Sequence, residues 1–406
     1  MNVLFVSSLF PFPVDKGAKI RLVQLMRALS LRHNVSLAVL DAVGTQTGRG
    51  KHPLEEKITV FPVAISQSER LLKCARGLVS CKPLQVWYCE SGNLRKKLRD
   101  ITKENKYEFA ILHLLRMADY AEEISGAQVI LDVGDAVSQY IRRSLEFRRS
   151  LPDRALLELE WRRVRRYETV RIPSFDCTLL TSEDDKAVIQ RVCPKARLEV
   201  IPNAVDLQYL VPSSEELPQS RVVFLGNFSY YPNVDAIMSF SREVLPIIWK
   251  ERPDLQFYVV GASPPKAVRA LASDSRIVVT GTVPDVREYL VRSSIFVCPV
   301  RFGGGTKFKV LEAMAMGLPV VSTEVGCEGI DVCDGRELFV AHNSGEFAQH
   351  VLRLASDTSL SREMGNASRK AMESKYDQDV VASCLEALLL GLRKTDLRIA
   401  KPCGPA

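Results

Sequence analysis

Short apolar runs rich in β-branched residues alternate along this chain with longer segments whose apolar positions recur every three or four residues. The short runs predict strands, because a few apolar residues between polar turns fit a buried strand. The longer segments predict helices, such as Ile20–Arg32, Val234–Trp249, Val286–Arg292 and Lys307–Met316. The predicted strands are Val3–Val6, Val35–Leu40, Ile58–Phe61, Phe109–Leu112, Val129–Asp132, Cys177–Thr181, Leu198–Ile201, Val222–Leu225, Phe257–Val260, Ile277–Thr280, Ile295–Cys298, Val320–Ser322 and Leu338–Val340.

This alternation is typical of βαβ units, in which helices cover both faces of a parallel sheet. The series breaks once, at the polar, proline-containing stretch 207–220, and we expect a domain boundary near Ser213–Ser220. The chain therefore predicts an α/β fold of two tandem doubly wound Rossmann-like domains with an interdomain cleft, and ligands at the carboxyl ends of the strands. The expected parts are 1–206, 207–375, a helix at 376–395 and a tail at 396–406.

Composition narrows the class of protein. The 406 residues are 46% apolar and 25% charged, which excludes a disordered chain, a fibre or a small disulfide scaffold, and the length fits two domains. The net charge is +7, but residues 1–206 carry 33 Lys/Arg and 25 Asp/Glu, a surplus of +8, whereas the remainder is at −1. This asymmetry permits an anionic partner for the first half.

Cysteine and histidine give no sign of a metal site. The ten Cys form no C-x-x-C pair and the five His are scattered, so we expect no metal and reduced, structural thiols in a cytoplasmic protein. The start of the chain lacks the basic region of a signal peptide, and no run of 18 apolar residues predicts a spanning helix.

The loop after the first strand, Ser7–Gly17, lacks the G-x-G-x-x-G of a dinucleotide fold, which weighs against a nicotinamide or flavin cofactor. Gly17 stands just before a helix N-terminus, where backbone amides favour an anion, and Lys16, Lys19 and Arg21 add positive charge. A plain start of a helix with surface cations explains the same pattern equally well.

A second loop, Arg301–Thr306, follows the strand that begins at Ile295. Its glycines, Gly303, Gly304 and Gly305, permit a tight turn with free amides, and Thr306 suits the N-cap of the helix that follows. A diphosphate on this helix N-terminus would be flanked by Arg301, Lys307 and Lys309, and the Glu312 carboxylate could accept hydrogen bonds from the vicinal hydroxyls of a ribose. The alternative is a simple tight turn in which Glu312 pairs with a neighbouring lysine.

This segment resembles the donor-sugar signature of glycosyltransferase family 4, of the GT-B fold, in its R-x-G-G-G-T loop, Lys309 and the L-E-A-M-A-x-G-x-P-V-V run. Asp15–Arg21 resembles the first-loop pattern of a bacterial sugar-transferase subgroup of exopolysaccharide assembly. Ile201–Asp206 resembles the family's I-P-N-G-V-D linker, and Val279–Val286 its V-T-G-x-V-x-D-V turn. The resemblance spans roughly residues 1–375. It implies an acceptor-binding first domain, a donor-binding second domain and a C-terminal helix that crosses back to the first.

Two departures from the family pattern matter. Many members carry two glutamates with seven residues between them; the second is Glu312, but the first falls on Gly304, so the carboxylate credited with contacting the donor sugar is missing. Members also often place cations in the loop after the first strand of the second domain, which here reads Gly226–Asn233. Phosphate charge must then be met by Arg301 with Lys307 or Lys309.

Candidate residues of the first domain lie at two strand ends. The resemblance implies that His113 positions the transferred sugar, although a lone histidine at a strand end is often structural. Asp132 and Asp135, at the end of the next strand, are acceptor-side or base candidates, and solvated loop acids explain them equally. Lys16 and Arg21 belong to the same acceptor side.

An Arg-rich stretch covers Tyr140–Ile172. Helical spacing places Trp161, Val164, Tyr167 and Ile172 on one face with Leu157, and it places Arg162, Arg163, Arg165 and Arg166 largely elsewhere. A solvated helix face explains this pattern, and so does contact with anionic lipid or a lipid-diphosphate acceptor. Nucleic acid is disfavoured, because aromatic residues are sparse among the cations.

The resemblance and the residues together predict a hexosyltransferase of the family 4 type, without cofactor, that moves a sugar from a nucleotide diphospho-sugar to a glycan, lipid-linked or small-molecule acceptor. Metal-independent transfer with retention of anomeric configuration is expected, by a cytoplasmic protein at the inner face of the membrane. Catalytic roles are expected for His113, Arg301 and Lys309. A nucleotide-sugar epimerase of the same fold and a non-catalytic sugar-nucleotide-binding homologue remain as alternatives.

Overall fold

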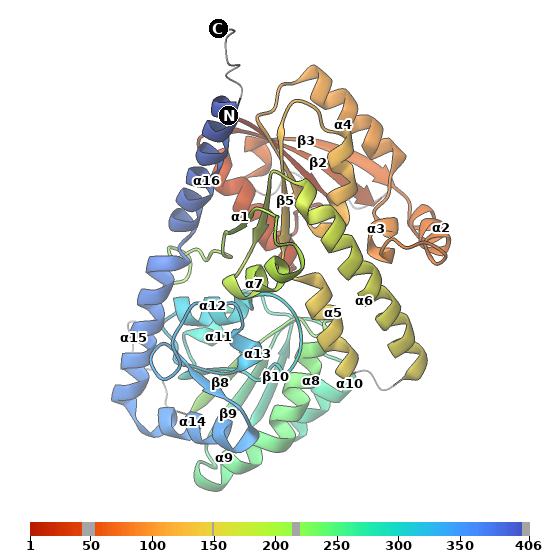
Figure 1. The fold of residues 1–406 in the computed structure, drawn as a ribbon. Helices are drawn as coiled ribbons and strands as arrows, with labels where there is room; N and C mark the ends of the chain where they lie inside the picture. Colours follow the sequence, from red (N-terminus) through yellow and green to blue (C-terminus); the bar gives the residue numbers. More distant parts are fainter. Residues whose placement is uncertain (43–52, 148–149, 213–219, 400–406) are drawn as a thin grey trace. The chain divides into compact units, whose positions relative to one another are not determined.

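The computed structural model describes residues 1–42, 53–147, 150–212 and 220–399, in two compact units (Figure 1). Unit 1 comprises Met1–Asn203 and Asp379–Ala406, and unit 2 comprises Ala204–Gln378. The predicted boundary near Ser213–Ser220 lies, except for its last residue, outside the described residues, as do residues 400–406 of the predicted tail.

Unit 1 is built on a seven-stranded parallel sheet in the order β3-β2-β1-β4-β5-β6-β7, flanked by helices. Its strands are β1 (Asn2–Ser7), β2 (Asn34–Ala42), β3 (Ile58–Ile65), β4 (Phe109–His113), β5 (Gln128–Gly134), β6 (Cys177–Leu180) and β7 (Leu198–Val200). Its helices are α1 (Gly17–Ser30), α2 (Gln67–Gly77), α3 (Leu84–Tyr88), α4 (Gly92–Glu104), α5 (Val137–Glu146), α6 (Leu151–Arg171), α7 (Glu183–Val192) and α16 (Gln378–Ile399), with 3-10 turns η1 (Glu55–Lys57), η2 (Leu115–Glu123) and η3 (Ile172–Ser174).

Unit 2 has a six-stranded parallel sheet in the order β10-β9-β8-β11-β12-β13. Its strands are β8 (Arg221–Leu225), β9 (Gln256–Val260), β10 (Ile277–Gly281), β11 (Ile295–Cys298), β12 (Val320–Thr323) and β13 (Phe339–Ala341). Its helices are α8 (Tyr231–Ser239), α9 (Leu245–Glu251), α10 (Lys266–Arg269), α11 (Arg287–Leu290), α12 (Phe308–Ala315), α13 (Glu324–Cys327), α14 (Ser344–Ser356) and α15 (Thr358–Lys375), with a π turn η4 (Phe240–Val244) and a 3-10 turn η5 (Ala270–Ser273).

The two sheets confirm the predicted α/β class and all of the predicted strands. The central strands read as continuous apolar runs because they are buried on both faces: Val3–Val6 and Phe109–Leu112 are at most 1% exposed. Strand β1 pairs with β4 in a register that sets Ser7 beside His113. Each unit has its own core of buried side chains, so each has the anatomy of a domain.

Two helical predictions need correction. The helix predicted at Val234–Trp249 is α8 and α9 joined by the π turn, because Pro246 has no N–H to bond the Arg242 carbonyl. The Arg-rich stretch forms α5 and α6, and its Arg163 is buried rather than solvated. Nη2 of Arg163 donates to the Leu78 carbonyl at 2.6 Å.

The C-terminal helix α16 belongs to unit 1. It buries Leu385, Leu389 and Leu392 and pairs Glu386 with Arg32 at 2.7 Å. None of the described helices, α16 included, has both the length and the apolar character needed to cross a membrane.

Candidate functional site

The candidate donor site lies at the carboxyl ends of β8 and β11. The connections turn outward from these two neighbouring strands in opposite directions, which makes this edge the topological switch point of unit 2. Ligands of doubly wound folds bind at such a point. The loop 226–230 follows β8, and the glycine loop 303–305 precedes α12.

The loop after β8 is held by close backbone packing. A Cβ atom on Gly261 would lie 1.9 Å from the Gly226 carbonyl oxygen, so only glycine fits at position 261, where φ is also +141°. Nδ2 of Asn233, on the first turn of α8, donates to the Asn227 carbonyl at 2.8 Å. These contacts fix the loop that faces α12.

The glycine loop makes the turn that its composition predicts. Gly303 and Gly305 have φ values of +134° and +72°, which side chains disfavour. A Cβ on Gly303 would lie 3.1 Å from the Tyr230 hydroxyl oxygen. The helix after this loop ends where predicted, at Gly317, whose φ is +70°.

The start of α12 differs from the prediction. The N-cap residue is Lys307 rather than Thr306, and no side chain caps the first turn. Thr306 is buried, and its hydroxyl has no hydrogen-bond partner in the part of the chain that the structure describes. Nζ of Lys307 donates to the Gly305 carbonyl at 2.6 Å. Of the first-turn amides of α12, that of Val310 donates to the Lys307 carbonyl at 2.9 Å, and within the described ranges those of Phe308 and Lys309 are left for a ligand or water.

Lys309 connects the two loops. Its Nζ donates to Oδ1 of Asn233 at 2.6 Å and lies 4.1 Å from the centre of the Phe224 ring. Burial, with the charge of Lys307 acting in the same direction, lowers the pKa of the Lys309 amine to about 8. The amine thus has one uncharged acceptor and remains able to bind an anion.

Glu312 lies one turn after Lys309 on α12. Its half-buried carboxylate makes no hydrogen bond or ion pair within 4 Å in the described ranges, but it interacts electrostatically with Lys309, so the predicted alternative of a pair with a neighbouring lysine stays open. Burial raises the pKa of this carboxyl, and the charge of Lys309 opposes that rise only in part. A half-buried acceptor of this kind is suited to a polar ligand.

Arg301 is placed differently from the prediction. Its guanidinium makes two hydrogen bonds to the Asp235 carboxylate, at 2.8 and 2.9 Å, and this pairing raises the pKa of the arginine. Its positive charge is therefore already neutralised, in contrast to that of Lys309. Arg301 and Lys309 thus bond different residues of α8, Asp235 and Asn233.

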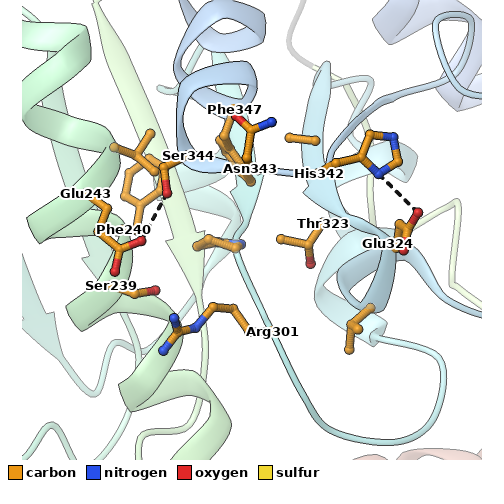
Figure 2. A pocket seen from close by; sticks show the side chains of 14 residues that line it. Ser239, Phe240, Glu243, Arg301, Thr323, Glu324, His342, Asn343, Ser344 and Phe347 are labelled. Atoms are coloured by element: carbon orange, nitrogen blue, oxygen red, sulfur yellow. Dashed lines mark hydrogen bonds and ion pairs between the residues drawn. The ribbon is translucent and has the colours of Figure 1, made fainter.

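Arg301 instead lines a hollow of about 400 Å³ in unit 2 (Figure 2). On one side Ser344 Oγ donates to Glu243 at 3.0 Å, and on the other His342 Nδ1 lies 3.1 Å from Glu324. These acids make the hollow unsuited to a diphosphate.

His113, Asp132 and Arg21 form a buried cluster in unit 1. Arg21 Nη2 and His113 Nδ1 lie 2.6 and 2.8 Å from the Asp132 carboxylate, and all three side chains are at most 4% exposed. Burial alone would raise the pKa of Asp132, but the charge of Arg21 and the hydrogen bond from His113 lower it to about 2. The carboxylate is thus held ionised within an ion pair.

This cluster corrects the expectation that His113 contacts the transferred sugar. Its Nε2 lies 2.9 Å from the Ala18 carbonyl oxygen in the first turn of α1, so both ring nitrogens are occupied. Arg21 Nη1 donates to the Ile201 carbonyl at 2.9 Å. The three residues position α1 and the end of unit 1, and neither Arg21 nor Asp132 is open to an acceptor.

The remaining candidate site residues of unit 1 are exposed or partly buried. Lys16 and Gly17, at the N-terminus of α1, are exposed, and no side chain caps this helix. Lys19 is paired with Asp15 at 2.9 Å. Asp135 accepts a hydrogen bond from Thr181 at 3.2 Å, which gives it a structural partner. In the ranges that the structure describes, no group of three or more His, Cys, Asp or Glu could hold a metal.

Comparison with known proteins shows what unit 2 resembles. Residues 219–357 match the family model described as glycosyl transferases group 1. This part of unit 2 is therefore similar in sequence to group 1 glycosyl transferases. The match confirms the resemblance to glycosyltransferases, while assignment to family 4 in particular stays a prediction.

Known proteins match this chain along nearly its whole length. The chain is 21% identical to an uncharacterised 44.6 kDa protein in the cps region of Klebsiella pneumoniae, over 95% of this chain and 98% of that one. Sucrose-phosphate synthase from Thermosynechococcus elongatus superposes with a TM-score of 0.73 at 16% identity, over 97% and 100% of the chains. Anabaena HepE in complex with UDP gives 0.69 at 14% identity, over 96% and 100%. The fold is thus GT-B.

Asn233 was not predicted from the sequence as a residue of the candidate donor site. The loop after β8 lacks the cations that the family pattern places there, yet Lys309 brings an amine to it from α12 through Asn233. The sequence feature that could have indicated it is an amide side chain on the first turn of α8, which pairs with a lysine on the first turn of α12.

Proposed function

We propose that the chain is a glycosyltransferase that moves a sugar from a nucleotide diphospho-sugar to a glycan, lipid-linked or small-molecule acceptor. Unit 2 would hold the donor and unit 1 the acceptor. The observation that carries the proposal is the pair on α12, one turn apart beside a glycine loop: the Lys309 amine is hydrogen-bonded to an uncharged partner, and the Glu312 carboxylate has no hydrogen bond within the described ranges. The match to group 1 glycosyltransferases and the UDP in the Anabaena HepE structure support it.

The donor diphosphate would bind the uncapped N-terminus of α12. First-turn amides and the helix dipole favour an anion there, and Lys309 supplies a full charge within the same turn. Negative charge grows on the leaving diphosphate as the glycosidic bond breaks, so a fixed cation and fixed amides stabilise the transition state. Lys307 and the amides of Gly303–Gly305 would complete the cradle, and the uncapped start of α1 at Lys16 and Gly17 is a further anion site for the donor or acceptor.

Glu312 would bind the ribose of the donor. A carboxylate accepts hydrogen bonds from two vicinal hydroxyls at once, and its present lack of partners makes this exchange favourable. Gly304 stands where the family pattern has a carboxylate that contacts the donor sugar. Other groups would therefore have to bind the sugar.

Metal-independent transfer with retention of configuration completes the proposal. Lys309 and the α12 amides would take the role that a divalent cation has elsewhere. Two measurements bear on these points: activity after exhaustive chelation, which should persist, and the anomeric configuration of the first-formed product by NMR, which should match that of the donor.

The decisive experiment is a calorimetric binding panel of UDP-, GDP-, ADP- and dTDP-sugars. One of them should bind, and Glu312→Gln and Lys309→Met should each weaken that binding about tenfold or more, because each removes a charge-assisted hydrogen bond. Glu251→Gln and Lys250→Met, exposed neighbours on α9, are matched controls and should bind as the wild type does. If both site variants keep wild-type affinity, the donor site is wrong.

Turnover assays separate the alternatives. Transfer that requires an added acceptor supports a glycosyltransferase. Epimerisation of the donor without any acceptor would instead show a nucleotide-sugar epimerase, and tight donor binding without turnover a non-catalytic homologue.

We further propose that unit 1 contacts an anionic membrane surface. Arg162, Arg165 and Arg166 are exposed on α6, where with Trp161 they line a shallow hollow. The Arg163 bond to Leu78 joins α6 to the end of α2, where Val79 is 94% exposed. Cations beside an exposed apolar side chain are the combination that binds anionic lipid. Such contact would keep a cytoplasmic enzyme beside a lipid-linked acceptor.

A further inference from the structure

Two arginines for which the described part of the chain supplies no acidic partner lie near each other at the carboxyl edge of the unit 1 sheet. Arg70 is on α2, after β3, and Arg116 follows β4. Nε of Arg116 donates to Oγ of Ser8, the residue after β1, at 2.8 Å. The Arg70 guanidinium lies over the Tyr88 ring, 4.8 Å from its centre.

Neither guanidinium has a carboxylate within ion-pair distance in the described ranges of the chain. Arg70 is nevertheless only 6% exposed, and Arg116 is half-buried. Other buried or half-buried arginines of unit 1 do have acidic partners: Arg21 has Asp132, Arg95 has Glu90 and Glu123, Arg163 has Glu160, and Arg171 has Asp119 and Glu122. An uncompensated buried charge is costly, so the arrangement calls for a ligand that supplies the missing negative charge.

Electrostatics in the cluster point the same way. Burial and the nearby charge of Arg70 lower the pKa of Arg116. Cys89 lies beside both arginines, but burial raises the pKa of its thiol despite them, so it stays neutral and does not provide the counter-charge. A bound anion would relieve the repulsion between the two guanidinium groups.

The position in the fold is one where ligands bind. Strand β1 is followed by the connection to β2 on one side, and β4 by the connection to β5 on the other, so Ser8 and Arg116 meet at the topological switch point of unit 1. The buried cluster of His113, Asp132 and Arg21 occupies the neighbouring edge and is internally satisfied. The guanidinium groups at this edge that have no acidic partner within the described ranges are therefore those of Arg70 and Arg116.

We propose that Arg70, Arg116 and Ser8 bind an oxyanion group, phosphate or carboxylate, carried by the acceptor. The proposal rests on the proposed transferase function, and it narrows the acceptor to an anionic one, such as a sugar phosphate, a prenyl-linked diphosphate or a uronic acid. Guanidinium groups bind both kinds of oxyanion through paired hydrogen bonds, and a serine hydroxyl adds a third donor. A neutral sugar would leave the two charges unpaired.

Calorimetry on the full chain tests the proposed oxyanion site. The ligands are inorganic phosphate, glucose 1-phosphate, a short-chain prenyl diphosphate, glucuronate and neutral glucose. At least one anion should bind and glucose should not. Arg70→Gln and Arg116→Gln should each lower the anion affinity about tenfold or more. Arg76→Gln, an exposed position on the same helix α2, should change nothing. The phosphate and carboxylate arms identify which oxyanion the acceptor carries.

Two further variants make the outcome unambiguous. Arg70→Lys keeps the charge and should restore part of the affinity, which a folding defect would not allow. Anion binding that Lys309→Met abolishes and Arg70→Gln leaves intact belongs to the donor site and overturns the proposal, as does the absence of any anion binding. Nucleotide-sugar binding, measured on the same samples, fails or succeeds independently, so the failure of the donor site and the failure of this site are distinguishable.

Discussion

At the scale of single residues, the protonation of Lys309 links donor affinity to pH. The folded protein holds the pKa of this amine at about 8, below that of an ordinary lysine, because the side chain is partly buried. A diphosphate binds the charged form. Donor affinity should therefore be constant below pH 7 and fall as pH rises through about 8. Calorimetric titration between pH 6 and 9.5 measures this, and Lys309→Met should give a flat, weak profile; a wild-type profile that is flat over this range contradicts the role of Lys309.

The same lowered pKa has the opposite effect on stability. Between the folded pKa and the higher unfolded pKa, the unfolded chain binds more protons, so the contribution of Lys309 to the free energy of unfolding rises with pH in that window. Lys309→Met removes the cost of a partly buried charge, and we expect it to stabilise unit 2 at pH 7 by about 1–3 kcal/mol. Urea unfolding at pH 7 checks this, with Lys250→Met as the control. If Lys309→Met is as stable as the wild type or less stable, burial of the charged amine does not destabilise unit 2.

Asp132 titrates in the other direction. Its folded pKa of about 2 lies below the unfolded value, so its stabilising contribution is fully present above about pH 4 and is lost as pH falls towards 2. Asp132→Asn leaves Arg21 buried without a counter-charge and should destabilise unit 1 by about 3–5 kcal/mol at pH 7. Chemical denaturation at pH 7 and pH 3 measures both effects. A variant equally stable at pH 7 would mean that the cluster contributes little.

At the scale of elements, the loops after β8 and β9 depend on one backbone contact. Gly261→Ala would place a methyl group against the Gly226 carbonyl at a positive φ, and we expect a loss of about 3 kcal/mol or more together with weaker donor binding. Gly92→Ala is the matched control, since its Cβ would meet nothing within 4 Å and it begins helix α4. Thermal unfolding of the two variants should differ clearly. Similar melting temperatures would contradict the close approach.

Elements were more predictable than the contacts between them. The strands could be read from the sequence because strands buried on both faces are continuous apolar runs, as in Phe109–Leu112. The π turn before α9 was missed because hydrophobic spacing does not report a single lost hydrogen bond at Pro246. The pairing of Arg301 with Asp235 was missed because 66 residues separate them, and only the folded sheet brings α8 beside the loop after β11.

Candidate site residues could be located from the sequence, but their contacts with distant residues could not. Glu312 and Lys309 share one helix turn, so local spacing identified them. His113 could be located at a strand end, but its two partners, Asp132 and Ala18, come from β5 and α1, and their presence changes a sugar contact into a structural one. Motif positions are local, whereas the satisfaction of a buried polar atom is a property of the fold.

At the scale of the whole molecule, the charge asymmetry is sharper by unit than by sequence half. Unit 1 carries 37 Lys/Arg and 27 Asp/Glu, a net charge of +10, and unit 2 carries 18 and 21, a net charge of −3. In the proposed function, an anionic donor would therefore bind a unit of its own sign through a few local contacts, whereas an anionic surface would meet a unit of opposite sign.

The two kinds of binding should respond differently to salt. Binding to vesicles with 30% phosphatidylserine should weaken strongly between 50 and 300 mM salt, and replacing Arg162, Arg165 and Arg166 by Gln should remove most of it, because each surface cation contributes about 1 kcal/mol. Donor affinity should change little over the same range. Neutral vesicles are the control in sedimentation assays. Binding that salt does not affect would contradict the membrane contact.

The partly neutral amine of Lys309 also makes it a nucleophile. At pH 7 a larger fraction of it is unprotonated than of an ordinary lysine, so it should react faster with acylating reagents. A bound diphosphate would hold the proton on the amine and block this reaction. Mass spectrometry of the acylated protein would then report occupancy of the site directly, with no knowledge of the acceptor, and would turn one buried charge into a covalent sensor for the donor.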